Sequence, residues 1–264
     1  METMAGVAVE AGQGTSVSRT ARARARAQIT AELLATARRH LAEHGAAALS
    51  LRSIARDMGM TSSAVYRYVA SRDELLTMLI IEAYGAVADT AEEADRSAVA
   101  GGAEPGERWL SVARSIRAWA WAHPHQYALI YGTPVPDYRA SPDTIPNVAR
   151  IWRVVTAIVA KAVASGSLNP PVRPLPMDGV FGEEALAFIG GLPSPPFTDA
   201  MLRGVGLYTS LIGTISSELF GHYVGFTDHP DTMFDLLVAA AADGVGLEVP
   251  VAAGRHPRPS AQPE

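Results

Sequence analysis

The sequence predicts an all-α protein in which a small N-terminal three-helix unit with a helix-turn-helix precedes a larger helical body. Three observations lead to this prediction. Apolar residues recur at spacings of three and four along most of the chain, and almost no stretch alternates as a strand would. Clusters of glycine and proline separate these periodic stretches. A hydrophobic content of 48% in 264 residues is ample for a sizeable core.

Composition excludes several kinds of chemistry. The chain has no cysteine, which excludes disulfides, thiolate nucleophiles and cysteine-ligated metals. Its first residues have neither a basic region nor a long apolar run, so we expect no signal peptide. No uncharged apolar stretch reaches about 18 residues, so we expect no membrane span. These features are typical of a cytoplasmic protein.

Charge is distributed unevenly along the chain. The formal net charge is −5, yet residues 19–72 hold ten arginines and no lysine against three acidic residues, a balance of +7. Residues 1–18 contribute −2, which leaves −10 for residues 73–264. A basic N-terminal fifth on an acidic body indicates that one end of the molecule meets a polyanion, whereas the plainer interpretation is a solvated charged surface.

The chain begins with two polar segments and a helix. Residues 1–18 are rich in small and polar residues without periodicity, so we expect a disordered tail. Arginine and alanine then alternate over residues 19–26, which suits an extended arm along phosphates or a minor groove, or only a charged lead-in. The first helix should run to about Glu43 and end at Gly45. Its apolar stripe comprises Ile29, Leu33, Ala37 and Leu41.

Residues 50–76 have the form helix, tight turn, helix, turn, helix. Gly59 follows the first apolar-periodic segment, where a chain leaving a helix often needs a positive φ. Thr61 can cap the second helix, and Ser71 with Glu74 has the spacing of a capping box for the third. Two short helices across such a turn make a helix-turn-helix, whose second helix is sized for the DNA major groove.

This stretch resembles the DNA-binding domain of the TetR family of transcriptional regulators, over roughly residues 25–80. Members commonly carry an aromatic-rich LYxHF run and a lysine that opens the next helix. Here the run reads VYRYV, and an arginine replaces the lysine. The matching residues are Ile54, Ala55, Gly59, Tyr66, Arg67, Tyr68, Val69, Arg72, Glu74, Leu75 and Leu76.

Eight residues are candidates for DNA contact, from the three hydroxyl residues that open the second helix to the arginine that opens the third. Arg67 points away from the expected core and is the candidate base reader, because a guanidinium pairs bidentately with guanine. Arg52 and Arg72 are expected at phosphates, and the resemblance implies the same for the two tyrosines. Any one of them, taken singly, can be a plain surface residue. The set is Arg52, Thr61, Ser62, Ser63, Tyr66, Arg67, Tyr68 and Arg72.

The body begins with a long helix from Ser71 to about Ala98, which links the two parts of the chain. Further helices are expected at residues 107–122, 125–131, 147–165, 182–189 and 197–223, with a final helix ending near Gly244. The segment WAHPHQYALIYG, which ends at Gly132, resembles a TetR subgroup whose C-terminal domain carries an HPxxYxLxxG pattern. The segment from Val251 should be a second disordered tail.

An aromatic cavity in the body would suit a small apolar or aromatic effector. The candidate lining residues are Trp109, Trp119, His123, Tyr127, Tyr131 and Trp152, although each is equally at home in a plain core. His123 and His125 flank a proline and cannot share a helical face, so we expect no metal site and no cofactor.

A stripe of small residues marks the helix expected at 197–223 and lets another helix approach closely. TetR-like proteins dimerise through their last two helices, so the resemblance implies a homodimer, whereas ordinary packing within the chain is the alternative. The dimerisation candidates are Gly206, Ser210, Gly213, Ser217, Phe234 and Leu237.

Together these features predict a disordered tail at 1–18, a DNA-binding domain at 19–72, a ligand-binding and dimerisation domain at 73–249 and a tail at 250–264. The expected function is a homodimeric repressor that a small, hydrophobic or aromatic ligand releases from a palindromic DNA operator. Alternatives are a DNA-binding regulator without an effector and an all-α enzyme. An enzyme is disfavoured, because the chain has no GxSxG, no HExxH and no glycine-rich phosphate loop after a strand.

Overall fold

The computed structural model describes residues 10–251, with side chains described for residues 21–251. The chain divides into two compact units. Of the described residues, unit 1 holds those up to Glu82 together with Ala128–Thr144, and unit 2 holds Ala83–Tyr127 together with those from Ile145 onward. This division differs from the single boundary predicted after Arg72, because part of residues 128–144 packs against the core of unit 1.

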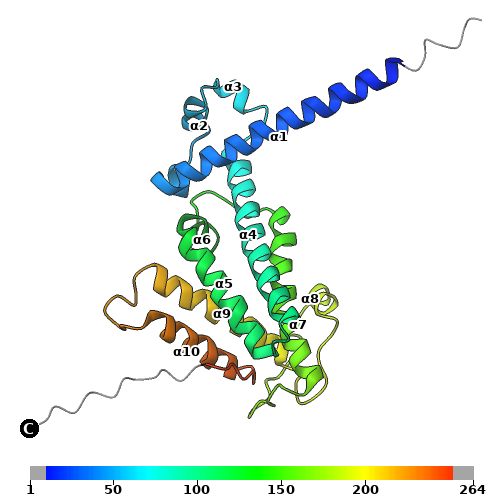
Figure 1. Ribbon diagram of the computed structural model, residues 1–264, viewed down its shortest axis with the longest axis vertical. Helices are drawn as coiled ribbons and strands as arrows, with labels where there is room; N and C mark the ends of the chain where they lie inside the picture. Colours follow the sequence, from blue (N-terminus) through cyan, green and yellow to red (C-terminus); the bar gives the residue numbers. More distant parts are fainter. Residues whose placement is uncertain (1–9, 252–264) are drawn as a thin grey trace, which may run out of the picture. The chain divides into compact units, whose positions relative to one another are not determined.

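Unit 1 is built on three helices and the first turns of a fourth (Figure 1). Its elements are α1 (Glu10–His44), the short 3-10 helix η1 (Ala46–Ala48), α2 (Leu51–Asp57), α3 (Ser62–Val65), the start of α4 (Arg72–Ala100), the end of α6 (Pro124–Tyr131) and η2 (Pro142–Thr144). Helix α2 packs against both α1 and α3. Fully buried residues from every helix of the motif form one core, namely Leu33, Ala37, Ile54, Val65, Leu75 and Leu76.

Helix α1 starts earlier than the sequence pattern predicts. It runs without a break from Glu10 to His44, so residues 10–18 are helical and the arginines of residues 19–26 do not form an extended arm. For residues 19–26 the physical reason is composition, since alanine and arginine are both strong helix formers. Residues 1–9 and 252–264 lie outside the described residues, so the disorder predicted for the two ends is not described there.

The expected turn signals are present in the helix-turn-helix. Gly59 has φ 64° after α2, a conformation that favours glycine. The Thr61 hydroxyl accepts a hydrogen bond from the Ala64 N–H at 3.3 Å, which caps α3. The Ser71 hydroxyl accepts from the Glu74 N–H at 3.0 Å, and Glu74 reaches back to accept from the Ala70 N–H at 2.5 Å. These local bonds fix where each helix begins.

Unit 2 is a bundle of helices: the rest of α4, α5 (Pro105–Ala122), the start of α6, α7 (Ile145–Ser165), α8 (Glu183–Ile189), α9 (Ala200–Leu219) and α10 (Pro230–Asp243). Helix α5 packs against α7, α9 and α10, while α9 and α10 lie side by side (Figure 1). Residues 10–251 contain no β-strand, only one isolated bridge between Leu168 and Leu247. Within the same residues no helix is long and apolar enough to cross a membrane.

Bidentate arginine pairs join the helices of unit 2. Arg108 of α5 donates to both carboxylate oxygens of Asp95 on α4, at 2.8 and 3.0 Å. Arg117 of α5 donates to both carboxylate oxygens of Glu218 on α9. Its guanidinium carbon lies 4.8 Å from the centre of the Phe234 ring on α10. Such forked pairs fix geometry as well as charge, so they set how α5 meets its neighbours.

The segment after α10 is tied back onto the bundle. Its apolar side chains are buried, and the Asn169 N–H donates to the Gly246 carbonyl at 2.8 Å. Gly246 has φ 86°, and a β-carbon there would lie 2.0 Å from the Asn169 carbonyl oxygen. A β-carbon on Gly106 of α5 would lie 1.8 Å from the carbonyl oxygen of Glu248. The backbone passes so closely at both positions that only glycine fits.

Candidate nucleic-acid interface and ligand region

Residues 61–69 form the recognition segment, which is one short helix followed by overlapping turns. Only α3 has regular helical bonds, after which the Tyr68 N–H donates to the Val65 carbonyl at 2.9 Å and the Val69 N–H donates to the same carbonyl at 3.2 Å. Val65 and Val69 are fully buried in the core of unit 1. These two anchors hold the backbone, so the residues between them project from the unit.

The predicted DNA-contact residues of this segment lie at or near its surface. Ser63, Tyr66 and Arg67 are exposed, with 49% of Tyr66 accessible. Ser62 and Tyr68 are half-buried. The Thr61 hydroxyl is used inside the segment, because it caps α3 and lies 3.1 Å from the Ser63 hydroxyl. The segment therefore presents a guanidinium, a phenol and hydroxyls on one short stretch of backbone.

Arg26 of α1 supports the recognition segment, a role that sequence reasoning missed. Its Nη1 donates to the Arg67 carbonyl at 3.0 Å, and its guanidinium lies 5.4 Å from the centre of the Tyr68 ring. A cation over an aromatic face and a charged hydrogen bond together fix the end of this segment against α1. Periodicity alone gave no signal for this contact, because the two residues are 41 positions apart.

Arg72 is committed to backbone carbonyls within unit 1. Its Nε donates to the Leu49 carbonyl at 3.2 Å, and its Nη2 donates to the Ala46 and Ala47 carbonyls at 3.0 and 3.2 Å. The guanidinium thus ties the start of α4 to the connection between α1 and α2. This structural role was not expected of a residue predicted to clamp a phosphate, and phosphate contact by Arg72 stays a prediction.

A buried histidine braces the first helix of the motif. His40 of α1 is 5% exposed, and its Nε2 lies 2.7 Å from an Asp57 carboxylate oxygen at the end of α2. The hydrogen bond with His40 lowers the pKa of Asp57, and the positive field of nearby Arg56 and Arg39 adds to this. This hydrogen bond joins α1 to α2 within unit 1.

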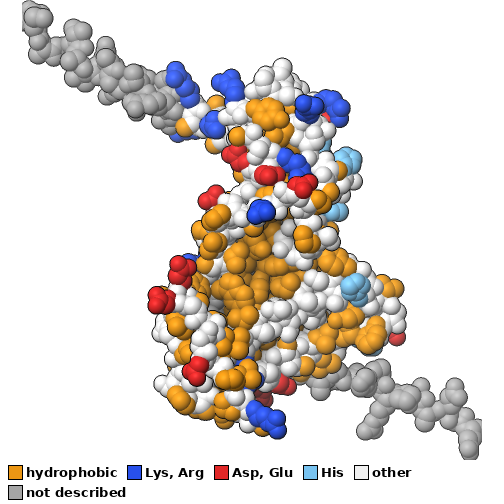
Figure 2. Space-filling model, turned by 180° about the vertical axis from the view of Figure 1, so that it is seen from behind, with side chains coloured by type: hydrophobic (Ala, Val, Ile, Leu, Met, Phe, Trp, Pro, Cys, Tyr) orange, Lys and Arg blue, Asp and Glu red, His pale blue; other side chains and the backbone are white. Residues whose placement is uncertain are grey.

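The arginines of unit 1 fall into two groups. Arg26, Arg38 and Arg72 are bound to groups of the chain itself, Arg38 to the Glu82 carboxylate. Among the described residues, the others that stand exposed without a bidentate carboxylate partner are Arg22, Arg24, Arg39, Arg52, Arg56, Arg67 and Arg139. The blue side chains that Figure 2 shows over α1 to α3 are arginines, since the chain's single lysine, Lys161, lies on α7. This concentration of positive charge is what a polyanion would meet.

Two of the residues predicted to line a ligand cavity, Trp109 and Tyr127, are buried in unit 2. Trp109 is 1% exposed and Tyr127 is fully buried. The Tyr127 hydroxyl donates to the Ile212 carbonyl at 2.8 Å and lies 2.9 Å from the Ser216 hydroxyl, so it joins α6 to α9. Burial raises the pKa of Tyr127 to about 12. Both residues belong to the core of unit 2.

Of the remaining four ligand candidates, Trp119, His123 and Trp152 lie in unit 2, and Tyr131 lies in unit 1. Trp119 stacks on His123 with ring centres 5.5 Å apart, and the His123 ring nitrogen lies 3.0 Å from the Trp119 carbonyl oxygen. Trp152 meets Tyr208 edge to face at 4.9 Å, and Tyr131 is half-buried at the end of α6. The structure therefore does not gather the six predicted residues around one described pocket.

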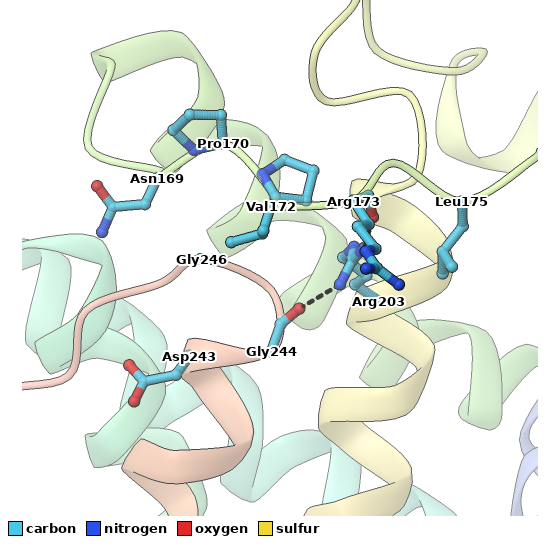
Figure 3. A pocket seen from close by; sticks show the side chains of 10 residues that line it. Asn169, Pro170, Val172, Arg173, Leu175, Arg203, Asp243, Gly244 and Gly246 are labelled. Carbon is cyan, nitrogen blue, oxygen red and sulfur yellow. Dashed lines mark hydrogen bonds between the residues drawn. The ribbon is translucent and has the colours of Figure 1, made fainter.

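One pocket of about 570 Å³ lies in unit 2, and none of those aromatic residues lines it (Figure 3). Prolines and aliphatic side chains of the loop after α7 form one side, while Arg203 and the turn after α10 form the other. Arg203 is held in place, since it donates to the buried Asp199 carboxylate at 2.9 Å and to the Gly244 carbonyl at 2.9 Å. Sequence reasoning missed this pocket because its walls come from loops that are distant in the chain.

The predicted dimerisation residues separate into an exposed and a buried group. Gly206, Ser210 and Gly213 of α9 and Leu237 of α10 are exposed, and Ser217 is half-buried. Phe234 corrects the prediction: it is 1% exposed because it packs inside the chain beneath Arg117, so it offers no surface to a second copy.

No group of three histidine, aspartate or glutamate side chains is arranged to hold a metal ion among the described residues.

Comparison with known proteins finds matches for both the N-terminal and the C-terminal part of the chain. A family model described as bacterial regulatory proteins of the tetR family matches residues 33–79, and one described as a Tetracyclin repressor-like C-terminal domain matches residues 109–241. The HTH-type transcriptional regulators Mb1846 of Mycobacterium bovis and Rv1816 of Mycobacterium tuberculosis are each 42% identical to this chain over 233 residues, covering 83% of this chain and 94% of the relative.

Solved structures with the same fold extend this result. The crystal structure of the regulatory protein SCO4313 matches with a TM-score of 0.63 at 32% identity, covering 83% of this chain and 98% of that one. A bacterial regulatory protein of the tetR family from Rhodococcus RHA1 matches with a TM-score of 0.54 at 18% identity, covering 83% and 97% of the two chains. The second likeness concerns the fold alone.

Proposed function

Because the chain belongs to the tetR family of bacterial transcriptional regulators, with a DNA-binding helix-turn-helix, we propose that it is a homodimeric repressor. A small, apolar or aromatic ligand would release it from a palindromic operator. The single observation that carries the proposal is the recognition segment, which holds Arg67 and Tyr66 exposed between two buried valine anchors. Family and fold are those of regulators, which generally have no enzymatic activity.

On DNA, the recognition segment lies in the major groove with Arg67 as base reader. Its guanidinium would pair with the O6 and N7 of a guanine, while the tyrosines and the serines of α3 contact phosphates. Arg52 is exposed at the start of α2 and supplies a further phosphate contact. Arg72 is left with a supporting role at the base of the motif, where its donors already serve carbonyl oxygens.

The dimer contact is proposed for the exposed faces of α9 and α10. A β-carbon on Gly206 or Gly213 would meet nothing within 4 Å, so this face of α9 is open to close helix approach. Large apolar side chains lie exposed nearby, including 75% of Phe226 between the two helices and 51% of Leu236 on α10. These exposed apolar side chains support an interface at α9 and α10. A two-fold dimer would present two recognition segments about 34–36 Å apart along the duplex, or a multiple of that spacing.

Release by a ligand requires that the ligand bind one conformation of the dimer more tightly than the other. The proposed effector site lies in unit 2, with Trp119, His123 and Trp152 as its candidate residues. The described pocket beside Arg203 is the second place for it. The matched C-terminal family model supports a ligand-responsive body. Reciprocity then demands that operator DNA weaken ligand binding by the same factor as ligand weakens DNA binding.

Fluorescence anisotropy tests the proposal. The full-length chain is titrated onto duplexes selected from a random-sequence pool and onto scrambled controls across a salt series. A regulator should bind the selected duplex about 10³-fold or more tightly than the control. Equal affinity for the selected and the scrambled duplexes would mean that the protein binds DNA without sequence specificity. A thermal-shift screen with apolar and aromatic compounds then separates an effector-responsive repressor from a regulator without effector.

A further inference from the structure

Helix α1 continues far beyond the contact that it makes with the recognition segment. It begins at Glu10, and Arg26 is its contact residue, so at a rise of about 1.5 Å per residue roughly 24 Å of helix precede that contact. The core of the motif does not need this length, because the first fully buried residue of α1 is Leu33. Packing in the core of unit 1 therefore does not account for the length of α1 that precedes Arg26.

The face of this extension that carries Arg26 also carries Arg22. Residues four apart in a helix lie above one another on one face, whereas Arg24 is two positions from each and points to the other side. Arg26 itself marks which face this is, since it donates to the Arg67 carbonyl and covers the Tyr68 ring. Arg22 therefore continues the surface of the recognition segment along α1.

Beyond its first residue, Glu10, the extension is strongly positive and has no acidic residue of its own. No acidic residue lies between Glu10 and Glu32, and every residue from 21 to 28 is exposed. No ion pair involves Arg22 or Arg24 within the described part of the chain. The same stretch contains only alanine and glutamine besides its arginines from residue 21 to 28, so it lacks the large apolar face with which an amphipathic helix binds a membrane surface. Nucleic-acid phosphates are the polyanion that this charge pattern fits.

We propose that the Arg22 face of α1 binds backbone phosphates of the duplex that flank the bases read by the recognition segment. This inference rests on the proposed DNA binding and extends it to a second element. The contact is electrostatic and independent of sequence, because arginine at a phosphate neutralises charge and releases condensed counterions. It enlarges the footprint of each subunit without adding a base reader.

Two variants with the same net charge test the assignment. Arg22→Gln removes the guanidinium on the recognition face, and Arg24→Gln removes one on the other side of the same helix. Binding of the full-length proteins to the selected and the scrambled duplexes is measured from about 50 to 200 mM salt. Because each phosphate contact adds about 0.9 to the salt slope, wild type should lose about threefold more affinity than Arg22→Gln over this range on both duplexes. Arg24→Gln should follow wild type.

Duplex length supplies the second readout. Trimming base pairs that flank the selected site should weaken wild type and leave Arg22→Gln nearly unchanged, because that variant no longer uses the flank. Circular dichroism and thermal unfolding verify that both variants keep their helices. If Arg22→Gln and Arg24→Gln both match wild type, or if both weaken binding equally, the flanking contact is refuted.

The two proposals fail in different ways. Loss of discrimination between selected and scrambled duplexes by wild type refutes the sequence-specific repressor. The comparison of Arg22→Gln with Arg24→Gln still tests the flanking contact in that case, because the salt dependence of affinity can be measured on scrambled DNA as well.

Discussion

Arg67 projects into solvent from a backbone that neighbours hold at several points. Val65 and Val69 bury their side chains on either side of it, and Arg26 binds its carbonyl oxygen. A long side chain on a fixed backbone loses less freedom on binding than one on a mobile loop, which favours precise base contact. The recognition chemistry thus depends on residues that never touch DNA.

Replacing this side chain tests base reading. Arg67→Ala should reduce discrimination between the selected duplex and one with the read base pair changed by about 1–3 kcal/mol, the cost of a bidentate guanine contact. Arg52→Ala is the matched control, since loss of a phosphate contact should weaken both duplexes alike. Anisotropy titrations of the two variants measure this difference. Equal weakening of both duplexes by Arg67→Ala would assign Arg67 to a phosphate instead.

Tyr127 provides a test in the body. Tyr127→Phe removes its hydrogen bonds with Ile212 and Ser216 and should lower the free energy of unfolding by about 0.5–1.5 kcal/mol in urea. Tyr66→Phe is the control, because that phenol is half accessible and should leave stability unchanged.

The raised pKa of Tyr127 gives a pH dependence with a definite sign. Its pKa is about 12 in the folded protein and about 10 in an unfolded chain. Between these values the unfolded chain has lost a proton that the folded protein retains, so stability falls as pH rises from about 10 to 12. Wild type should therefore lose stability more steeply there than Tyr127→Phe, as measured by urea unfolding at each pH. Parallel curves would contradict the burial of this phenol.

The helices of the body are joined by bidentate arginine–carboxylate ion pairs and by close backbone contacts. Arg108 binds α5 to α4, and Arg117 binds α5 to α9 while covering Phe234 of α10. The chain after α10 then returns over the start of α5, where Gly106 permits contact between two backbones. Helix α5 is consequently the element on which the others of unit 2 are assembled.

The close contact at α5 is a sharp test of that arrangement. Gly106→Ala would place a β-carbon 1.8 Å from the Glu248 carbonyl oxygen, so the segment after α10 must shift or detach. Overpacking of this kind costs about 1–3 kcal/mol, which a urea unfolding curve detects. In the control Gly101→Ala the nearest atom is 3.4 Å from the new carbon, so stability should change little. Equal stability of Gly106→Ala and wild type would mean that this segment is not bound to α5.

For the whole molecule, the proposed function depends on two copies binding one operator. Two recognition segments double the number of base contacts, and the dimer geometry selects the half-site spacing. The exposed small residues of α9 are the surface through which we propose that this geometry is set. Loss of the dimer should therefore abolish operator binding without unfolding the subunit.

Gly213→Leu tests the dimer surface. The position is open within the chain, and leucine is a better helix former than glycine, so each subunit should stay folded. Bulk on this face should keep two α9 helices apart and weaken dimerisation at least about tenfold, a loss of about 1.4 kcal/mol. Ala160→Leu adds comparable bulk to an exposed position of α7 and serves as control. Sedimentation equilibrium measures the dissociation constants, and an unchanged value for Gly213→Leu would move the interface elsewhere.

Local rules were sufficient where the structure depends on neighbours in the sequence. Helical periodicity, Gly59, Thr61 and the pair Ser71 and Glu74 correctly predicted the helices of the motif and where α3 and α4 begin, because propensity and capping act within one or two turns. The same reasoning failed for α1, where the alternation of arginine and alanine was taken for a possible extended arm although both residues favour helix.

The sequence by itself determined the all-α class, the helix-turn-helix and the position of Arg67 on its outer surface. Tertiary structure alone decided which side chains make their contacts within the chain. Arg72 donates to carbonyl oxygens, Phe234 packs beneath Arg117, and Tyr127 packs against α9. It also decided that Arg26 supports the recognition segment. The physical reason is range, since helix formation depends on residues a few positions apart, whereas burial and side-chain pairing join residues brought together from distant parts of the chain.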